Sequence, residues 1–179
     1  MTELLRLYVD IAFLRRGPED IPRASVVLLL TALGYFVVNA AVSVALPPLA
    51  DRWPVRLTID VVFILLWYWL LLRVTRKPER FLQTTSAVFG YQAIVAPLWI
   101  ASGWLAGHFR NNTSLVVPVT LLLLAVFVWT LTVNVRILRS ALGWPVGACI
   151  GLVCLQMVAE YLLNVGILPA PAPAASTTT

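Results

Sequence analysis

The sequence predicts an all-α polytopic membrane protein with five transmembrane helices, preceded by an N-terminal amphipathic interfacial helix. Of its 179 residues, 60% are hydrophobic and 12% are charged, whereas a soluble domain is about 45–50% apolar and about 25% charged. The mean hydropathy is +0.89. Five apolar runs are long enough to cross about 30 Å of hydrocarbon, which takes about 20 residues. Basic residues gather at the ends of those runs.

The first segment, residues 1–17, is expected to contain an amphipathic helix over residues 3–16. Its narrow polar face carries Glu3, Arg6 and Asp10, and apolar side chains surround the rest. The Gly17-Pro18 pair is expected to stop this helix. A helix of this kind lies in the plane of the membrane interface. A helix that docks on a partner has the same pattern, so both interpretations stay open.

The membrane domain is expected over residues 18–168. Its predicted spans are 24–48, 55–73, 82–106, 115–138 and 142–168. The last two are separated by a very short, Arg-containing turn, which predicts an antiparallel helical hairpin. Pro97 removes one helical hydrogen bond and predicts a kink in the third span. The Pro-, Ala- and Thr-rich tail, residues 169–179, has no apolar bulk to pack and is expected to be disordered.

Two further features concern the packing of the spans. Most Trp residues fall near a predicted membrane interface, where amphipathic rings prefer to lie, but Trp129 falls somewhat inside the inner boundary. Two pairs of glycines have the spacing that permits close helix contact; they are Gly103 with Gly107, and Gly147 with Gly151.

The distribution of Lys and Arg predicts the orientation. Ten of the 13 basic residues lie in the N-terminal segment, the second connection and the fourth connection. These segments are therefore predicted to be cytoplasmic, with the C-terminus in the periplasm of a bacterial inner membrane. Because the charges flank the spans, the net charge of +5 does not indicate nucleic-acid binding. The cytoplasmic face is expected to bind anionic lipid or membrane-protein partners through Arg15, Arg16, Arg23, Arg73, Arg76, Lys77, Arg80, Arg136 and Arg139.

Ionisable groups inside the spans are the strongest functional signal in the sequence. Asp60 and Glu160, with Asn39 at a similar depth, are predicted to form a polar cluster at one level of the outer leaflet. The functional interpretation is a site that gates a proton, an ion or a small polar solute, and the alternative is helix–helix contact. Arg56 lies four residues before Asp60 and can pair with it. Glu160 must pair across helices, with Arg56 or Arg110 as candidates, or remain protonated.

Motifs for catalysis, a cofactor or a metal are missing from the sequence. The chain has one His, His108, and its two cysteines, Cys149 and Cys154, point in different directions on a helix. Neither a zinc-protease motif nor a phosphate-binding glycine loop is present. We therefore expect a non-enzymatic protein without a cofactor.

Three stretches carry a resemblance to a known family. They are residues 15–22 with Gly17-Pro18, residues 80–97 with Phe89-Gly90-Tyr91 and Pro97, and residues 129–139. In order and content they resemble the Ypt-interacting-protein (Yip) domain family, specifically its small bacterial inner-membrane members. Leu14-Arg15-Arg16 stands where eukaryotic members have Asp-Leu-Tyr. The resemblance therefore implies a fold and a topology, and no trafficking role or activity.

Two functions follow from these expectations. The first is a scaffold or accessory subunit of a membrane complex, which fits the basic face and the missing motifs. The alternative is a small transporter or channel component that uses Asn39, Asp60 and Glu160.

Overall fold

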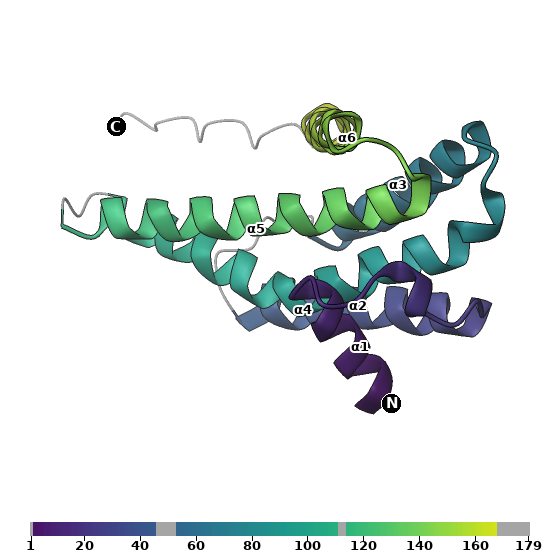
Figure 1. The fold of residues 1–179 in the computed structure, drawn as a ribbon. Coiled ribbons are helices and arrows are strands. Elements are labelled where there is room, and N and C mark those ends of the chain that lie inside the picture. Colours follow the sequence, from purple (N-terminus) through teal and green to yellow (C-terminus); the bar gives the residue numbers. More distant parts are fainter. Residues whose placement is uncertain (1, 46–52, 111–113, 168–179) are drawn as a thin grey trace.

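The computed structural model describes residues 2–45, 53–110 and 114–167 (Figure 1). Two short 3-10 helices, η1 (Pro18–Asp20) and η2 (Pro78–Arg80), precede α2 and α4. The predicted tail over 169–179 lies outside the described residues. The α-helices of the described residues are α1 (Thr2–Ala12), α2 (Ser25–Ala45), α3 (Trp53–Val74), α4 (Phe81–His108), α5 (Val116–Leu142) and α6 (Val146–Ile167).

Helices α2 to α6 are each long and apolar enough to cross a membrane, which confirms the prediction of five spans. The fourth span is longer than expected, because α5 continues to Leu142. It ends at Gly143, whose φ of 71° is left-handed and whose N–H donates to the Arg139 carbonyl at 2.7 Å. Glycine adopts this conformation without a steric penalty and is the usual residue after a helix end. The turn to α6 is thus residues 143–145, and it contains no Arg.

The predicted antiparallel hairpin of the last two spans is wrong. Helix α5 lies across the view in Figure 1, whereas α6 is seen nearly end-on, so the two helices cross steeply. Helix α6 contacts both α5 and α3. A short connection limits the distance between two helix ends but leaves the crossing angle to side-chain packing.

Helix α4 is at the centre of the molecule. It contacts α1, α2, α3 and α5, and each residue from Gln83 to Tyr91 is buried. The helix continues through Pro97 and bends along its length (Figure 1), while a kink at Pro97 itself stays a prediction. The first half of α4 is therefore surrounded by protein on all sides.

Helix α1 ends earlier than the sequence predicts. It stops at Ala12, and Leu14 adopts a φ of 62°. The Arg15 N–H then donates to the Asp10 carbonyl at 2.7 Å, and the Leu14 N–H donates to the Ile11 carbonyl at 3.0 Å. This is the Schellman geometry of a helix end. A non-glycine residue in the left-handed conformation thus ends α1 before Gly17-Pro18 is reached.

The apolar face of α1 packs on the protein's own bundle. Leu7, Tyr8 and Ile11 are buried, with α4 as the main contact. Gly90 of α4 makes this possible, because a Cβ built there would overlap the Tyr8 ring. Burial raises the pKa of Tyr8 to about 12, so the ring packs as a neutral phenol. The apolar face of α1 is therefore covered by the protein's own bundle, while docking on a partner and a position at the membrane interface both stay predictions.

The two glycine pairs do not serve close packing in the described part of the chain. A Cβ built at Gly103, Gly107, Gly147 or Gly151 would meet nothing within 4 Å. All four residues lie on exposed surface. The expectation of close helix contact through these pairs is wrong for contacts among the described residues of this chain.

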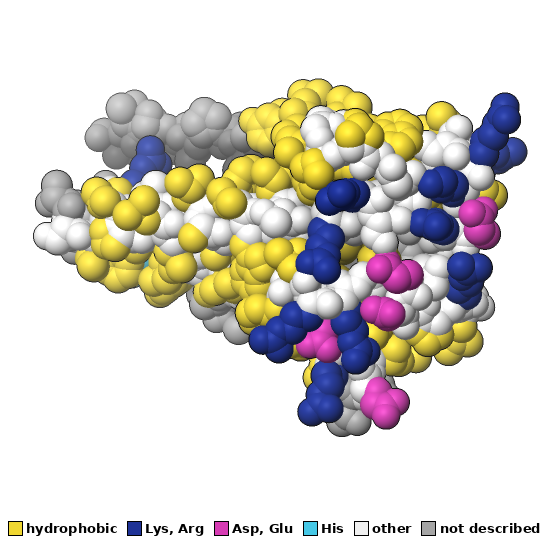
Figure 2. All heavy atoms as spheres, viewed as in Figure 1, with side chains coloured by type: hydrophobic (Ala, Val, Ile, Leu, Met, Phe, Trp, Pro, Cys, Tyr) yellow, Lys and Arg dark blue, Asp and Glu magenta, His cyan; other side chains and the backbone are white. Residues whose placement is uncertain are grey.

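Charged side chains gather at one end of the bundle (Figure 2). We call this the charged end and define it as residues 13–24, 75–80 and 143–145, together with the helix termini that these segments join. The three segments belong to the N-terminal lead-in, the α3–α4 connection and the α5–α6 connection. The rest of the face in Figure 2 is mostly hydrophobic or uncharged, as expected for helices that contact lipid.

Candidate functional site

A cavity of about 280 Å³ is lined by residues of α2, α4, α5 and α6. Part of its lining is apolar, including Val95 and Met157. Trp99 adds an aromatic ring, which also packs edge-on against Phe127. The polar lining residues are Tyr35, Asn39, Tyr91, Gln92, Thr130 and Glu160. The cavity thus places a carboxyl group, two side-chain amides and three hydroxyl groups inside an apolar bundle.

The structure brings two of the three predicted cluster residues to this cavity. Asn39 and Glu160 line it, and Asp60 does not. Asp60 accepts a hydrogen bond from the Asn164 side chain at 3.2 Å, and it lies close enough to Glu160 to interact with it electrostatically. Asp60 is therefore a second acidic group behind the cavity wall.

The predicted ion pairs are not formed. Within the described part of the chain, neither Asp60 nor Glu160 has a basic group within the 4.0 Å of an ion pair. Arg56 acts on both carboxyl groups only from a longer distance, and Arg110 lies on exposed surface near the C-terminal end of α4. A helix position four residues away does not compel a pair, because a long exposed side chain gains little from being held there.

Two polar residues of the site could have been found from helical spacing. Tyr35 precedes Asn39 by four residues, and Asn164 follows Glu160 by four, so each pair shares a helix face. The Asn39 amide donates to the Tyr35 carbonyl at 2.8 Å, and the Asn164 amide donates to the Glu160 carbonyl at 3.0 Å. Tyr91 and Thr130 carried no such signal, because only the tertiary packing brings them to the cavity.

Several buried polar atoms at the cavity have no hydrogen bond of normal geometry. The Tyr91 hydroxyl, on a fully buried residue, and the Gln92 side-chain oxygen are two of these atoms, although Gln92 and Asn134 lie near enough to the Tyr91 hydroxyl to interact with it. Thr130 is different, since its hydroxyl donates to the Val126 carbonyl at 2.8 Å. A buried polar group without a partner costs about 1–3 kcal/mol. The lining therefore retains polar atoms whose hydrogen-bonding capacity its own side chains satisfy only in part.

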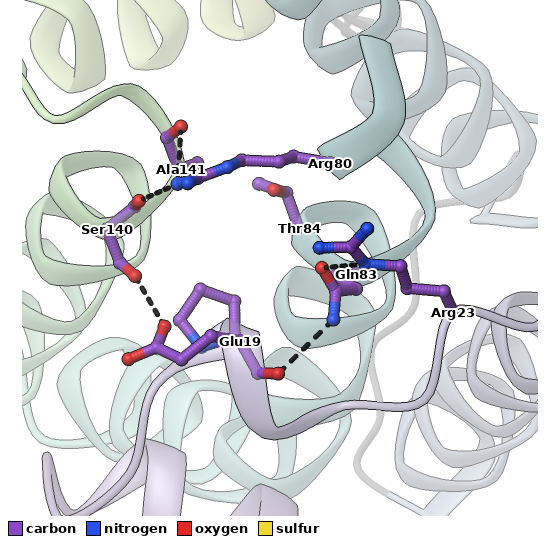
Figure 3. A pocket seen from close by; sticks show the side chains of 8 residues that line it. Glu19, Arg23, Arg80, Gln83, Thr84, Ser140 and Ala141 are labelled. Atoms are coloured by element: carbon purple, nitrogen blue, oxygen red, sulfur yellow. Dashed lines mark hydrogen bonds between the residues drawn. The ribbon is translucent and has the colours of Figure 1, made fainter. Parts of the chain in front are cut away.

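The charged end is held together by side chains that the sequence assigned to a lipid or partner surface. Buried Gln83 accepts a hydrogen bond from Arg23 Nε at 3.0 Å and donates to the carbonyls of Glu19 and Ile21 at 3.2 and 2.8 Å. Figure 3 shows these groups around a small pocket, with Ser140 of α5 donating to the Glu19 carboxylate on the opposite side. The N-terminal lead-in is thus bonded to both α4 and α5.

Two cations from the α3–α4 connection bind the end of α5. Lys77 Nζ donates to the Leu142 carbonyl at 2.5 Å, and Arg80 donates to the carbonyls of Ser140 and Ala141 at 2.6 and 3.2 Å. The last four carbonyls of a helix lack intrahelical partners, and the helix dipole favours cations at this end. Lys77 and Arg80 therefore cap α5.

Helix α5 in turn caps α1. Trp129 Nε1 donates to the Ala12 carbonyl at 2.9 Å, and Arg136 donates to the Leu14 carbonyl. The Trp129 ring also packs against Phe13, with centroids 5.5 Å apart. These contacts give Trp129 a packing role that does not depend on a membrane interface. It serves the docking of α1.

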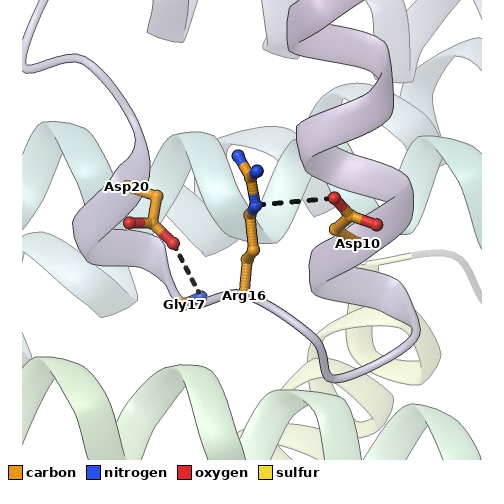
Figure 4. Close-up of polar contacts among 4 residues, drawn as sticks. All are labelled: Asp10, Arg16, Gly17 and Asp20. Atoms are coloured by element: carbon orange, nitrogen blue, oxygen red, sulfur yellow. Dashed lines mark hydrogen bonds and ion pairs between the residues drawn. The ribbon is translucent and has the colours of Figure 1, made fainter.

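The nine basic residues assigned to the cytoplasmic face therefore fall into two groups. Arg16 pairs with Asp10 at 3.5 Å (Figure 4), and Arg73 packs over the Trp69 ring. The other residues whose side chains bind within the protein are Arg23, Lys77, Arg80 and Arg136. Exposed side chains without such a contact in the described structure are those of Arg15, Arg76 and Arg139.

The fold and the cavity together define a polytopic α-helical membrane protein with a polar chamber inside its helix bundle. Comparison of the chain with protein-family models, curated proteins and solved structures finds no match. Function must therefore be inferred from the geometry of the cavity and of the charged end.

Proposed function

We propose that this protein is a small transporter or channel component that takes up a small polar or cationic solute in the Glu160 cavity. The observation that carries the proposal is the Glu160 carboxyl group, which together with Asn39 lines a cavity between the candidate spanning helices. A charged side chain inside a membrane costs about 2.5–3.5 kcal/mol on insertion scales. Such charged groups are retained where they serve a solute pathway, and a solute inside the cavity could bind this carboxyl group.

The location and orientation belong to the same proposal. The charged end faces the cytoplasm of a bacterium and the membrane is its inner membrane. Support comes from the positive-inside rule, because ten of the 13 basic residues lie in the N-terminal segment and in the two connections that meet at that end, with their flanking helix ends. The likeness to bacterial Yip-domain proteins is also proposed, and its support is the order of the three resembling stretches along a five-span chain.

The test is solute flux in liposomes that contain the purified full chain. Glu160→Gln removes the charge and retains the shape, so uptake of protons or monovalent cations should fall about tenfold or more, because hydrogen bonds to charged groups contribute about 1.5–3 kcal/mol. Glu79→Gln is the matched control, since Glu79 is exposed at the charged end and its loss should leave the flux unchanged. Equal impermeability of the unaltered protein, Glu160→Gln and empty liposomes would refute transport.

A second candidate function is a non-enzymatic accessory subunit that binds anionic lipid or a membrane partner at the charged end. The observation in its favour is the exposed group of Arg15, Arg76 and Arg139, whose side chains form no hydrogen bond or ion pair within the described residues. Each cation near an anionic surface contributes about 1 kcal/mol. Purification of the tagged protein from native membranes should then yield a stoichiometric companion chain. Reproducible recovery of a lone monomer would count against this function.

A further inference from the structure

We infer that the ligand of the Glu160 cavity is a small organic ammonium ion that carries at least one N–H. This inference deepens the proposed function and rests on the same cavity. The inference rests on three kinds of group that line the same cavity. They are one carboxyl group, polar oxygens without a hydrogen bond of normal geometry, and three aromatic residues.

The charge of the lining selects a cation. Glu160 is the one ionisable acid or base at neutral pH among the described residues that line the cavity, because Lys, Arg and His are missing from the lining. Asp60 adds a second acidic group behind the wall. An anion would meet the carboxyl group without a compensating positive partner, and such juxtapositions cost several kcal/mol in a low-dielectric site.

The aromatic residues favour an organic cation over a metal ion. Tyr35, Tyr91 and Trp99 all line the cavity, and aromatic residues attract Lys, Arg and ligand ammonium groups. Calcium takes 6–8 oxygen ligands, and magnesium requires near-ideal octahedral coordination. The lining offers one carboxyl group and a few neutral oxygens, which suits a single ammonium head better than a coordination shell of six or more oxygens.

The unsatisfied acceptors favour an ammonium ion with an N–H over a quaternary one. The fully buried Tyr91 hydroxyl and the Gln92 side-chain oxygen make no hydrogen bond of normal geometry, and the nearby Gln92 and Asn134 side chains satisfy the Tyr91 hydroxyl only in part. A protonated amine can donate to these oxygens and to Glu160 at once. A quaternary ammonium would leave them unpaired, at a cost of about 1–3 kcal/mol for each buried group.

The volume limits the ligand to about ten heavy atoms, because a cavity of about 150 Å³ already holds benzene. The cavity of about 280 Å³ lies just below the usual range of about 300–1,000 Å³ for small-molecule sites. The apolar residues Val95, Ala96, Ile100 and Met157 also line it. These side chains suit a short alkyl group beside the ammonium head.

The experiment compares matched ligands on the unaltered, purified protein by calorimetry. Propylammonium, propanol and propionate have similar size and differ in charge, and tetramethylammonium is charged without an N–H. Propylammonium should bind about tenfold or more tightly than each of the other three. Glu160→Gln and Tyr91→Phe should each weaken propylammonium binding, whereas Tyr161→Phe, a change at the exposed position next to Glu160, should not.

Because the ligand series uses the unaltered protein, a variant that fails to fold does not decide the outcome. Binding of propanol or propionate as tight as that of propylammonium, or no binding of any of them, would overturn the inference. Tetramethylammonium binding as tight as that of propylammonium would overturn the role of the N–H. Propylammonium binding without flux in liposomes would refute transport and leave the site in place. Cation flux that depends on Glu160, without propylammonium binding, would support transport and refute the organic ammonium ligand.

Discussion

A Gly90→Leu variant should release α1 from the bundle and expose the N-terminal segment to protease. The Tyr8 ring occupies the space where any side chain at Gly90 would begin, and both residues are buried. Inserting atoms into a packed contact costs about 1–3 kcal/mol, which shifts a docked-to-undocked ratio about 5- to 150-fold. Trypsin cleavage at Arg6 and Arg16, followed over time in detergent micelles, should accelerate within that range.

The chain offers a matched control in the same helix. A Cβ at Gly103 would meet nothing within 4 Å, so Gly103→Leu makes the same chemical change without the overlap and should leave cleavage at the N-terminus unchanged. Combining Gly90→Leu with Tyr8→Ala should recover part of the protection if the ring is the obstacle. Equal cleavage rates for the two leucine variants would show that α1 is not held at Gly90.

The contrast between α1 and the spans shows which features can be predicted from the sequence. The five spans follow from local composition, because each needs only enough apolar residues to cross hydrocarbon. The amphipathic pattern of α1 likewise predicts an apolar face, with Leu7, Tyr8 and Ile11 on it. The pattern does not say what covers that face. The answer depends on Gly90, a residue far away in the sequence whose lack of a side chain matters only after folding.

The same distinction holds for the candidate site. Asn39, Asp60 and Glu160 were recognisable because polar groups inside spans are costly. Their grouping came out partly as expected, since Asn39 and Glu160 share the cavity while Asp60 bonds to Asn164 behind it. The rotation of each helix about its axis decides which side a residue faces. That rotation is set by packing with neighbours, as is the steep crossing of α5 and α6 that replaced the expected hairpin.

For the basic residues, the sequence predicts where they gather but not what each side chain binds. Counting Lys and Arg groups the lead-in and the two connections on one side, and these segments do meet at the charged end. The count treats each cation as a surface charge. In the structure Lys77 and Arg80 instead point at the end of α5 and bond to its carbonyls. A charge that flanks a span can be a helix cap, and the spacing of the charges along the sequence does not distinguish the two uses.

The double variant Lys77→Gln/Arg80→Gln should lower the free energy of unfolding by about 2–4 kcal/mol. Three hydrogen bonds to the last carbonyls of α5 are lost, and charge-assisted bonds contribute about 1.5–3 kcal/mol each. Water at the charged end replaces part of the lost hydrogen bonding. The favourable interaction of both cations with the helix dipole is also lost. Helicity followed by circular dichroism during SDS titration of the detergent-solubilised protein measures the loss.

A general effect of removing positive charge is separated from capping by Arg76→Gln. Arg76 lies next to Lys77, its side chain is exposed, and it makes no side-chain hydrogen bond within the described residues, so this change should cost less than about 0.5 kcal/mol. Amide hydrogen exchange adds a local readout. The Gly143 N–H, which bonds to the Arg139 carbonyl, should exchange faster in the double variant and at the unaltered rate in Arg76→Gln. If the double variant and the control unfold alike, Lys77 and Arg80 do not cap α5, and the charged end owes its order to Gln83 and the docked lead-in.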